Sequence, residues 1–279
     1  MPPDDPFPVG LFVYHKLDAL FMVSSDQQSR VVGLSGSPNF RDAGGYASRH
    51  GSRMHWGKVY RSGHLATLSE ADQARFAQLE IELICDLRRP DEQAHEPSLI
   101  PSDVKVLSAP ITPGSQRSAI YDDSTQIRGA AAMVEFMCNI NREFVRSQSD
   151  SYRQVFAELL ESGATRVLFH CSAGKDRTGF AVAMLQMALG VADNDIEADY
   201  LLSRHYYRAE EQLPRVREKY PVDHLSDEDL APMMLSDIRY LHSALETIDA
   251  LHGSREDYLA VELGLGAQER EELRRRFLA

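Results

Sequence analysis

Long apolar segments are scarce in this chain of 279 residues. Stretches such as Val167 to Phe169 and Ala181 to Leu189 are short and separated by charges, whereas a helix needs about 20 apolar residues to cross a bilayer. The chain opens with acidic residues, and its first apolar stretch is broken by His15, Lys16 and Asp18, unlike a secretory signal. We therefore expect a cytoplasmic protein with no integral membrane segment, with signal-less export as the alternative.

Cysteine is also rare. The three cysteines, Cys85, Cys138 and Cys171, cannot build a disulfide framework, and their odd number leaves at least one free thiol, which favours a reducing compartment. The chain has no His-Glu-x-x-His and no Cys-x-x-Cys pattern, so we expect neither a metal site nor a cofactor.

Positive charge is the third scarcity. The net charge is -12, and no basic run offers the footprint that a nucleic-acid backbone requires. We expect no nucleic-acid partner. Any anionic substrate must be held by a few local groups.

The composition present, 43% hydrophobic and 26% charged, predicts one globular domain over residues 1–279, with residues 1–30 as an N-terminal extension. Short β-like runs alternate with helical patterns up to about residue 180, and Ser69 occupies a capping position before the helical pattern of residues 68–80. This alternation predicts an α/β fold with a mostly parallel central sheet flanked by helices. The expected strands are Val31 to Leu34, Lys58 to Tyr60, Glu82 to Cys85, Val104 to Ser108 and Arg166 to Phe169.

After residue 178 the pattern is helical almost to the end of the chain. A buried helix is expected to end at Gly190, and a second helix carries acidic residues in its first turn at residues 193–195. The basic triplet Arg274 to Arg276 is interpreted as a solvated C-terminal helix face.

Two segments look like insertions into the α/β body, residues 111–150 and 207–240. In the first, an apolar helical face carries Met133, Met137, Ile140 and Phe144. Either segment could form a lid-like cover over a site, or both could be ordinary surface helices, because methionine clusters serve in both settings.

The chemistry of the chain concentrates in residues 170–178, HCSAGKDRT, which connect an expected strand to an expected helix. Residues 172–176 (Ser172, Ala173, Gly174, Lys175 and Asp176) can curl so that their N–H groups point inward, and the following helix adds the positive end of its dipole. Arg177 supplies a planar fork that binds two phosphate oxygens. Such a cradle fits a phosphate ion and stabilises a thiolate on Cys171, which could attack phosphorus in line.

Three neighbours have supporting roles in this interpretation. Thr178 is placed to donate a hydrogen bond to the sulfur as it leaves, and His170 orients the loop rather than acting as a base. Lys175 either neutralises an additional phosphate of a polyanionic substrate or pairs with a nearby carboxylate.

The full string HCSAGKDRTGF resembles the motif of a bacterial tyrosine phosphatase family that carries His-Cys-x-x-Gly-Lys-Asp-Arg. The resemblance extends to SPNFRDAGGY near residue 40, GKVYRSGHLATLSE near residue 60, ICDLRRPDE near residue 85 and the C-terminal AVELGLGAQEREELRRRFL. It implies a phosphatase with a phosphocysteine intermediate that acts on phosphotyrosine, often also on phosphoserine, phosphothreonine or phosphoinositides. The implied partners are a phosphorylated protein or a phosphoinositide.

Two aspartates compete to protonate the leaving group. Asp176 lies in the loop, and its family counterpart is proposed to be the acid, whereas Asp86 ends an apolar run and should emerge at the carboxyl edge of the sheet. The alternative for Asp86 is an ion pair with Arg88 or a helix cap.

Three further residues have less specific roles. Arg41 with Asp42 could form an ion pair that pins the Gly-Gly turn of NFRDAGG, for which we favour a structural role, and Arg61 could line the substrate pocket. Cys85 could trap oxidised Cys171 as a disulfide, although a buried inert thiol is the simpler expectation.

Three other functions stay open at this point. The main activity could be on phosphoinositides or inositol phosphates, the loop could serve sulfur or arsenate chemistry, or the domain could be a catalytically silent phosphate-binding module. The intact Cys171 and Arg177 speak against the last of these.

Overall fold

The computed structural model describes residues 30–112 and 127–279. Its centre is a five-stranded sheet in the order β1-β2-β5-β3-β4. β1 pairs antiparallel with β2, and the other pairs are parallel, which confirms the expected α/β fold with a mostly parallel sheet. The strands are β1 (Arg41–Asp42), β2 (Val59–Ser62), β3 (Leu83–Asp86), β4 (Lys105–Ser108) and β5 (Val167–His170).

Four of the five expected strands correspond to β2, β3, β4 and β5, and the first does not form. Val31 pairs with Arg41 in an isolated bridge outside the named strands, and Gly33 has a φ of 74°, a left-handed conformation that interrupts extended pairing. The antiparallel edge is instead the two-residue β1, which the sequence pattern did not indicate.

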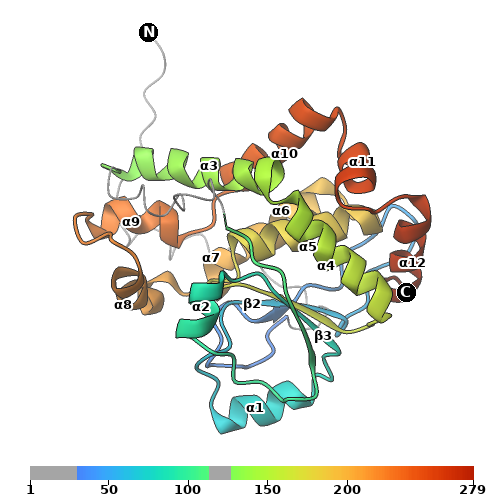
Figure 1. The fold of residues 1–279 in the computed structure, drawn as a ribbon, viewed down its shortest axis with the longest axis horizontal. Helices are drawn as coiled ribbons and strands as arrows, with labels where there is room; N and C mark the ends of the chain where they lie inside the picture. Colours follow the sequence, from blue (N-terminus) through green and yellow to red (C-terminus); the bar gives the residue numbers. More distant parts are fainter. Residues whose placement is uncertain (1–29, 113–126) are drawn as a thin grey trace.

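Two hydrophobic layers cover the two faces of the sheet. Side chains alternate along each strand: Leu83 and Cys85 pack into the larger core, whereas Ile84 packs with Phe76 of α1 on the opposite face. Figure 1 shows α1 alone below the strands, and α4, α5 and α6 on the other side. Most of the helices therefore lie on one face of the sheet.

Local signals explain several helix ends. The side chain of Ser69 caps α1 by accepting the N–H of Asp72, whose carboxylate accepts the N–H of Ser69 in return. Gly190, with a φ of 80°, ends α5, as expected. The helices are α1 (Glu70–Ala77), α2 (Pro90–His95), α3 (Ala130–Ser147), α4 (Ser149–Ser162), α5 (Asp176–Leu189), α6 (Asp193–Leu201), α7 (Ser203–Tyr206), α8 (Ala209–Lys219), α9 (Asp227–Met234), α10 (Ile238–His252), α11 (Arg255–Asp257), the π-helix η4 (Tyr258–Glu262) and α12 (Ala267–Phe277).

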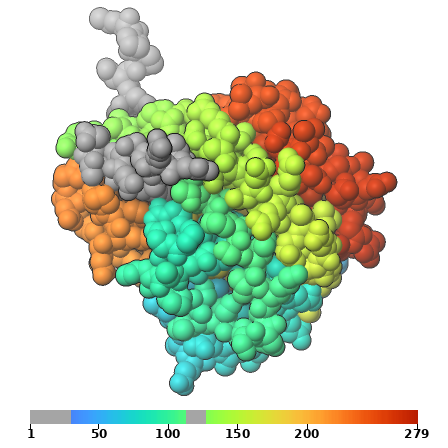
Figure 2. Space-filling view, in the orientation of Figure 1, coloured from blue at the N-terminus to red at the C-terminus, as the bar shows by residue number. Residues whose placement is uncertain are grey.

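The two insertion segments form helices that pack together. α3 buries Met133, Met137, Ile140 and Phe144, the predicted apolar face, and lies beside α9 and α10 in Figure 1. The second segment folds into α8 and α9, whose orange surface lies next to the green-cyan region around α2 in Figure 2. Part of the first segment, residues 113–126, and the N-terminal extension up to residue 29 lie outside the described residues.

The NFRDAGG segment has the structural role that we favoured, but by other contacts. Asp42 does not pair with Arg41. Its carboxylate accepts the N–H groups of Gly44 (2.7 Å) and Gly57 (2.5 Å), while the Arg41 guanidinium turns toward Asp199. The buried carboxylate therefore closes the turn by backbone contacts.

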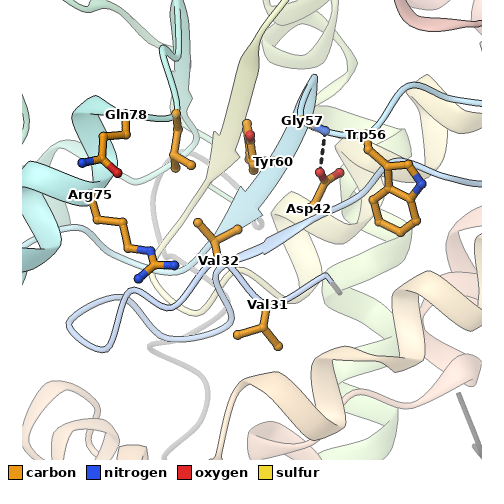
Figure 3. Close-up of a pocket in the computed structure, with 9 residues that line it drawn as sticks. Val31, Val32, Asp42, Trp56, Gly57, Tyr60, Arg75 and Gln78 are labelled. Carbon is orange, nitrogen blue, oxygen red and sulfur yellow. Dashed lines mark hydrogen bonds between the residues drawn. The ribbon is translucent and has the colours of Figure 1, made fainter. Parts of the chain in front are cut away.

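Beside this turn lies an open cavity of about 360 Å³ between β2 and α1 (Figure 3). Arg75 and Gln78 reach it from α1, and Val31, Val32 and Trp56 border it from the segments around β1. None of its lining residues borders the cavity at Cys171 described below.

No helix among residues 30–112 and 127–279 is long and apolar enough to cross a membrane.

Candidate active site

Cys171 lies directly after β5, at the carboxyl end of the central parallel strand. It is 2% exposed, and its Sγ accepts the N–H of Gly174 at 3.2 Å. Gly174 has a φ of 68°, and a Cβ on it would lie 2.3 Å from the carbonyl carbon of Ser62. Only glycine fits there, so the close packing of the loop on the end of β2 directs a backbone N–H at the sulfur.

Arg177, in the first turn of α5, is held by a carboxylate that sequence reasoning missed. Its Nη1 and Nη2 donate to the Glu92 carboxylate at 2.6 and 3.1 Å. Lys219 donates to the same carboxylate at 2.7 Å. Burial opposes ionisation of Glu92, but the charges of Arg177 and Lys219 outweigh it and hold its pKa well below the ordinary value. Glu92 thus orients the fork of Arg177 beside the loop.

Lys175 makes contacts that neither sequence interpretation anticipated fully. Its Nζ donates to the carbonyl oxygens of Met233 (2.6 Å) and Met234 (3.0 Å) at the end of α9 and lies 5.2 Å from the Tyr207 ring centre. The Asp176 carboxylate is 3.9 Å away. Burial lowers the pKa of Lys175. The loop lysine therefore ties the loop to the segment that covers it.

The two competing aspartates have different environments. Asp86 forms the ion pair with Arg88 that was one alternative to an acid role, accepting Arg88 Nη2 at 2.7 Å and Nε at 2.9 Å. Burial opposes its ionisation, but His170 and Arg88 hold its pKa well below the ordinary value. Asp176 borders the cavity, accepts a long hydrogen bond from the Tyr200 hydroxyl at 3.4 Å, and lies 3.9 Å from Lys175 Nζ.

The remaining predicted residues divide into those that border the cavity and those behind it. Ser172 and Ala173 border it, and Ser172 Oγ accepts Lys219 Nζ at 2.8 Å. His170 is buried, with its Nε2 3.5 Å from Asp86. Thr178 is fully buried, and its hydroxyl has no hydrogen-bond partner among the described residues.

Arg61 does not line this cavity, contrary to the expectation from sequence. It is fully buried and donates to the carbonyl oxygens of Gly174 (3.0 Å) and Lys175 (3.2 Å), which places its guanidinium behind the loop. The reason is its position on β2, the strand next to β5, which leads into the loop.

Both insertion segments contribute walls to the Cys171 cavity. α3 supplies Met137, α9 supplies Met233, and α8 supplies Arg215, whose guanidinium pairs bidentately with Glu96 and donates to Ser172 Oγ at 3.3 Å. The cavity is about 50 Å³. That space holds a small group, whereas pockets for organic ligands usually measure about 300–1,000 Å³.

Glu92, Arg215 and Lys219 are the functional candidates that sequence reasoning missed. Glu92 had a detectable signal, because Pro90 occupies the first position of α2 and an acid occupies the third, as in a capping box. Arg215 and Lys219 are four residues apart and lie on one face of α8. Nothing in the sequence indicated that this face would contact a loop about 40 residues earlier in the chain.

Cys85 is fully buried on β3, opposite Phe169 of β5, and its thiol is free. Burial raises its pKa. A thiol that stays protonated is a poor partner for disulfide exchange, which favours the inert role.

No group of three His, Cys, Asp or Glu side chains is placed to hold a metal ion in the part of the chain that the structure describes.

Comparisons with known proteins identify relatives of this chain. Over 229 residues the chain is 34% identical to a Cupriavidus necator protein assigned by name to the tyrosine-protein phosphatases, covering 79% of this chain and 80% of that protein. It is 31% identical to the triple specificity protein phosphatase PtpB of Mycobacterium tuberculosis, covering 81% and 91%. The crystal structure of P. aeruginosa TpbA aligns at 16% identity with a TM-score of 0.31, covering 72% of this chain and 97% of that one, a likeness too distant to place any residue of the site.

The model of the tyrosine phosphatase family matches residues 32–279, which include the Cys171 loop, the Glu92 helix and the helices that cover the cavity. The chain belongs to the tyrosine phosphatase family.

Proposed function

We propose that the protein hydrolyses phosphotyrosine through a phosphocysteine formed on Cys171. One observation carries the proposal: the Gly174 N–H points at Cys171 Sγ while Arg177, fixed by Glu92, borders the same small cavity. Backbone N–H groups at a helix start and a planar guanidinium together bind a tetrahedral dianion. A buried sulfur at the centre of that cradle is placed for in-line attack.

The reaction has two steps. In the first, the Sγ–P bond forms as the P–O bond to the substrate breaks, and Asp176 gives a proton to the departing oxygen. In the second, Asp176 takes a proton from water, whose oxygen attacks phosphorus, and the S–P bond breaks to release phosphate. The hydroxyl of Thr178, two residues into α5, donates to the sulfur as it leaves.

The assignment of the proton to Asp176 rests on the difference between the two aspartates. A general acid must be protonated before it acts, and the bidentate pair with Arg88 keeps Asp86 ionised. Asp176 borders the cavity, and its contact with Lys175 Nζ, at 3.9 Å, is longer than the bidentate pair of Asp86.

The substrate range is proposed to include phosphoserine, phosphothreonine and phosphoinositides. The name of PtpB describes a triple specificity phosphatase. In this chain Lys175, Arg215 and Lys219 surround the loop and could bind an additional phosphate once the contacts to α9, Glu96 and Glu92 open. Since Cys171 must stay reduced to act, we place the activity in a reducing compartment such as the cytoplasm.

The test compares wild type with Cys171→Ser on phosphotyrosine, phosphoserine and phosphothreonine peptides, phosphoinositides and inositol phosphates. We expect wild type to release phosphate and Cys171→Ser to bind the same substrates without turnover. Cys138→Ser is the matched control, because Cys138 is also a buried free thiol but lies on α3. Normal turnover by Cys171→Ser would overturn the proposal, and wild type that binds phosphate without releasing any would indicate a silent module.

A further inference from the structure

A buried polar cluster lies directly behind the Cys171 loop. It consists of Asn39, Arg41, Arg61, Asp199 and Ser203, each no more than 1% exposed. None of the five borders the Cys171 cavity. Removing these charged groups from water costs free energy, which their contacts within the protein must offset.

Two members of the cluster donate to three consecutive carbonyl oxygens of the loop. Asn39 Nδ2 donates to Ala173 (3.3 Å) and Gly174 (2.7 Å). Arg61 Nη2 donates to Gly174 (3.0 Å) and Lys175 (3.2 Å). The cluster thus holds this side of the loop by its acceptors.

These contacts fix where the N–H groups of the loop point. In a planar trans peptide the carbonyl and the following N–H point in opposite directions. With the three carbonyls turned toward the cluster, the N–H groups of residues 174, 175 and 176 turn away from it. The first of them demonstrates this, because the Gly174 N–H donates to Cys171 Sγ.

The donors are themselves held by shared acceptors. Asp199 accepts Arg61 Nη1 at 2.6 Å and lies 3.7 Å from Arg41 Nε. Ser203 Oγ accepts from all three donors, Asn39 (3.3 Å), Arg41 (3.2 Å) and Arg61 (3.4 Å). Arg41 also donates to Asn39 Oδ1, which fixes the orientation of that amide.

The charges in the cluster do not balance, since two guanidinium groups face one carboxylate. Burial and the charge of Arg61 lower the pKa of Arg41 to about 9, so Arg41 stays protonated at neutral pH. Burial opposes ionisation of Asp199, but Arg61 and Arg41 hold its pKa below the ordinary value. The excess charge behind the loop is therefore positive, and it favours an anion in the cavity in front.

We propose that Asn39 and Arg61 are positioning residues of the phosphate site, which hold the loop by the carbonyls of residues 173–175 and, with Arg41, place an uncompensated positive charge behind it. The inference rests on the proposed function, because it assumes that the loop binds phosphate. Neither residue touches the substrate, and both act through the loop backbone.

The first test is Asn39→Asp. Asn39 has a φ of 61°, a conformation that Asp also tolerates, and Asp keeps the acceptor for Arg41 but removes the donor to the loop. We expect the Ki of inorganic phosphate, measured by competition with p-nitrophenyl phosphate, to rise at least about tenfold, as for loss of a well-placed hydrogen bond. Asn141→Asp is the matched control, because that buried amide donates to the Met137 carbonyl within α3.

The second test is Arg61→Lys, which keeps the charge but cannot reach Asp199 and two carbonyls at once. Arg276→Lys is its control, since Arg276 also donates to two backbone carbonyls, those of Leu159 and Leu160, but away from the site. We expect phosphate affinity and kcat/KM to fall in Arg61→Lys by at least about tenfold while the control changes thermal stability only.

The outcomes separate the two levels of proposal. Wild type that releases no phosphate from any substrate contradicts the proposed function. If wild type is active and both Asn39→Asp and Arg61→Lys retain its phosphate Ki, or weaken it no more than their controls, the positioning role is wrong and the function stands.

Discussion

Glu92 illustrates how one buried carboxylate can serve two elements at once. It accepts hydrogen bonds from Arg177 in the first turn of α5 and from Lys219 of α8, and its own position is fixed by the Arg89 N–H at 2.9 Å. Removing its charge would take away the carboxylate that Arg177 and Lys219 share in a buried site, which costs more than the contact itself.

We predict that Glu92→Gln lowers kcat/KM about 10- to 100-fold, because an amide cannot hold both Arg177 Nη groups. Steady-state kinetics on phosphotyrosine peptide measure this effect. Glu135→Gln, which removes an exposed pair with Arg142 on α3, is the control and should leave kinetics unchanged. Equal kinetics in the two variants would contradict the role of Glu92.

The two aspartates give a second prediction. Asp176→Asn should lower kcat by about 100-fold on alkyl phosphates such as phosphoserine and by much less on p-nitrophenyl phosphate, whose leaving group needs no proton. Asp86→Asn should mainly destabilise the fold, since Arg88 would lose the carboxylate of its ion pair, and should show no such dependence on leaving group. The reverse pattern of leaving-group dependence would assign the acid to Asp86.

α8 and α9 form the outer wall of the cavity, and both are helices whose backbone hydrogen bonding is interrupted. Each carries an interior proline, Pro214 and Pro232, which removes a backbone hydrogen bond. A cavity of about 50 Å³ cannot admit a phosphotyrosine ring, so we infer that this wall moves when substrate enters. The ion pairs of Arg215 with Glu96, just after α2, and of Lys219 with Glu92 of α2 join this wall to the rest of the molecule.

We predict that Arg215→Met speeds alkylation of Cys171 by iodoacetamide several-fold, because loss of the Glu96 pair opens the wall more often. Mass spectrometry of the Cys171 peptide over time measures the rate. Arg208→Met, which removes an exposed pair with Glu211 at the start of the same helix, should not change it. An unchanged rate in Arg215→Met would mean that Glu96 does not restrain α8.

Taken as a whole, the molecule concentrates ionised carboxylates in its interior. Asp86, Glu92 and Asp199 are buried, and burial opposes their ionisation, but neighbouring cations hold the pKa of each below its ordinary value. Their stabilisation is therefore complete above the unfolded pKa, about 4, and is lost as the pH falls through the lower folded values.

We expect the melting temperature of wild type to fall steeply below about pH 4. In Glu92→Gln the melting temperature should fall less steeply in acid, because the variant lacks one carboxylate whose proton uptake is coupled to unfolding. Asp227→Asn, which removes a surface pair with Arg217, should leave the profile parallel to wild type. Differential scanning calorimetry measures both, and parallel profiles for wild type and Glu92→Gln would refute the linkage.

Much of this fold follows from local sequence signals. Three strands, at residues 83–86, 105–108 and 167–170, coincide with short β-like runs bounded by turns. Ser69 begins a helix by capping it with its side chain, and Gly190 ends a helix by adopting a left-handed backbone. The failure at Val31 to Leu34 came from Gly33, whose left-handed backbone overrides an apolar run.

The sequence by itself determined the family, the mostly parallel sheet and the loop from His170 to Thr178, because these depend on contiguous residues. Only the tertiary structure decided that Glu92 holds Arg177, that Arg61 lies behind the loop, and that α3, α8 and α9 wall the cavity. The reason is physical: a buried charge is stabilised by whichever groups packing brings next to it. For residues far apart in the chain, the local sequence does not indicate which carboxylate or carbonyl that will be.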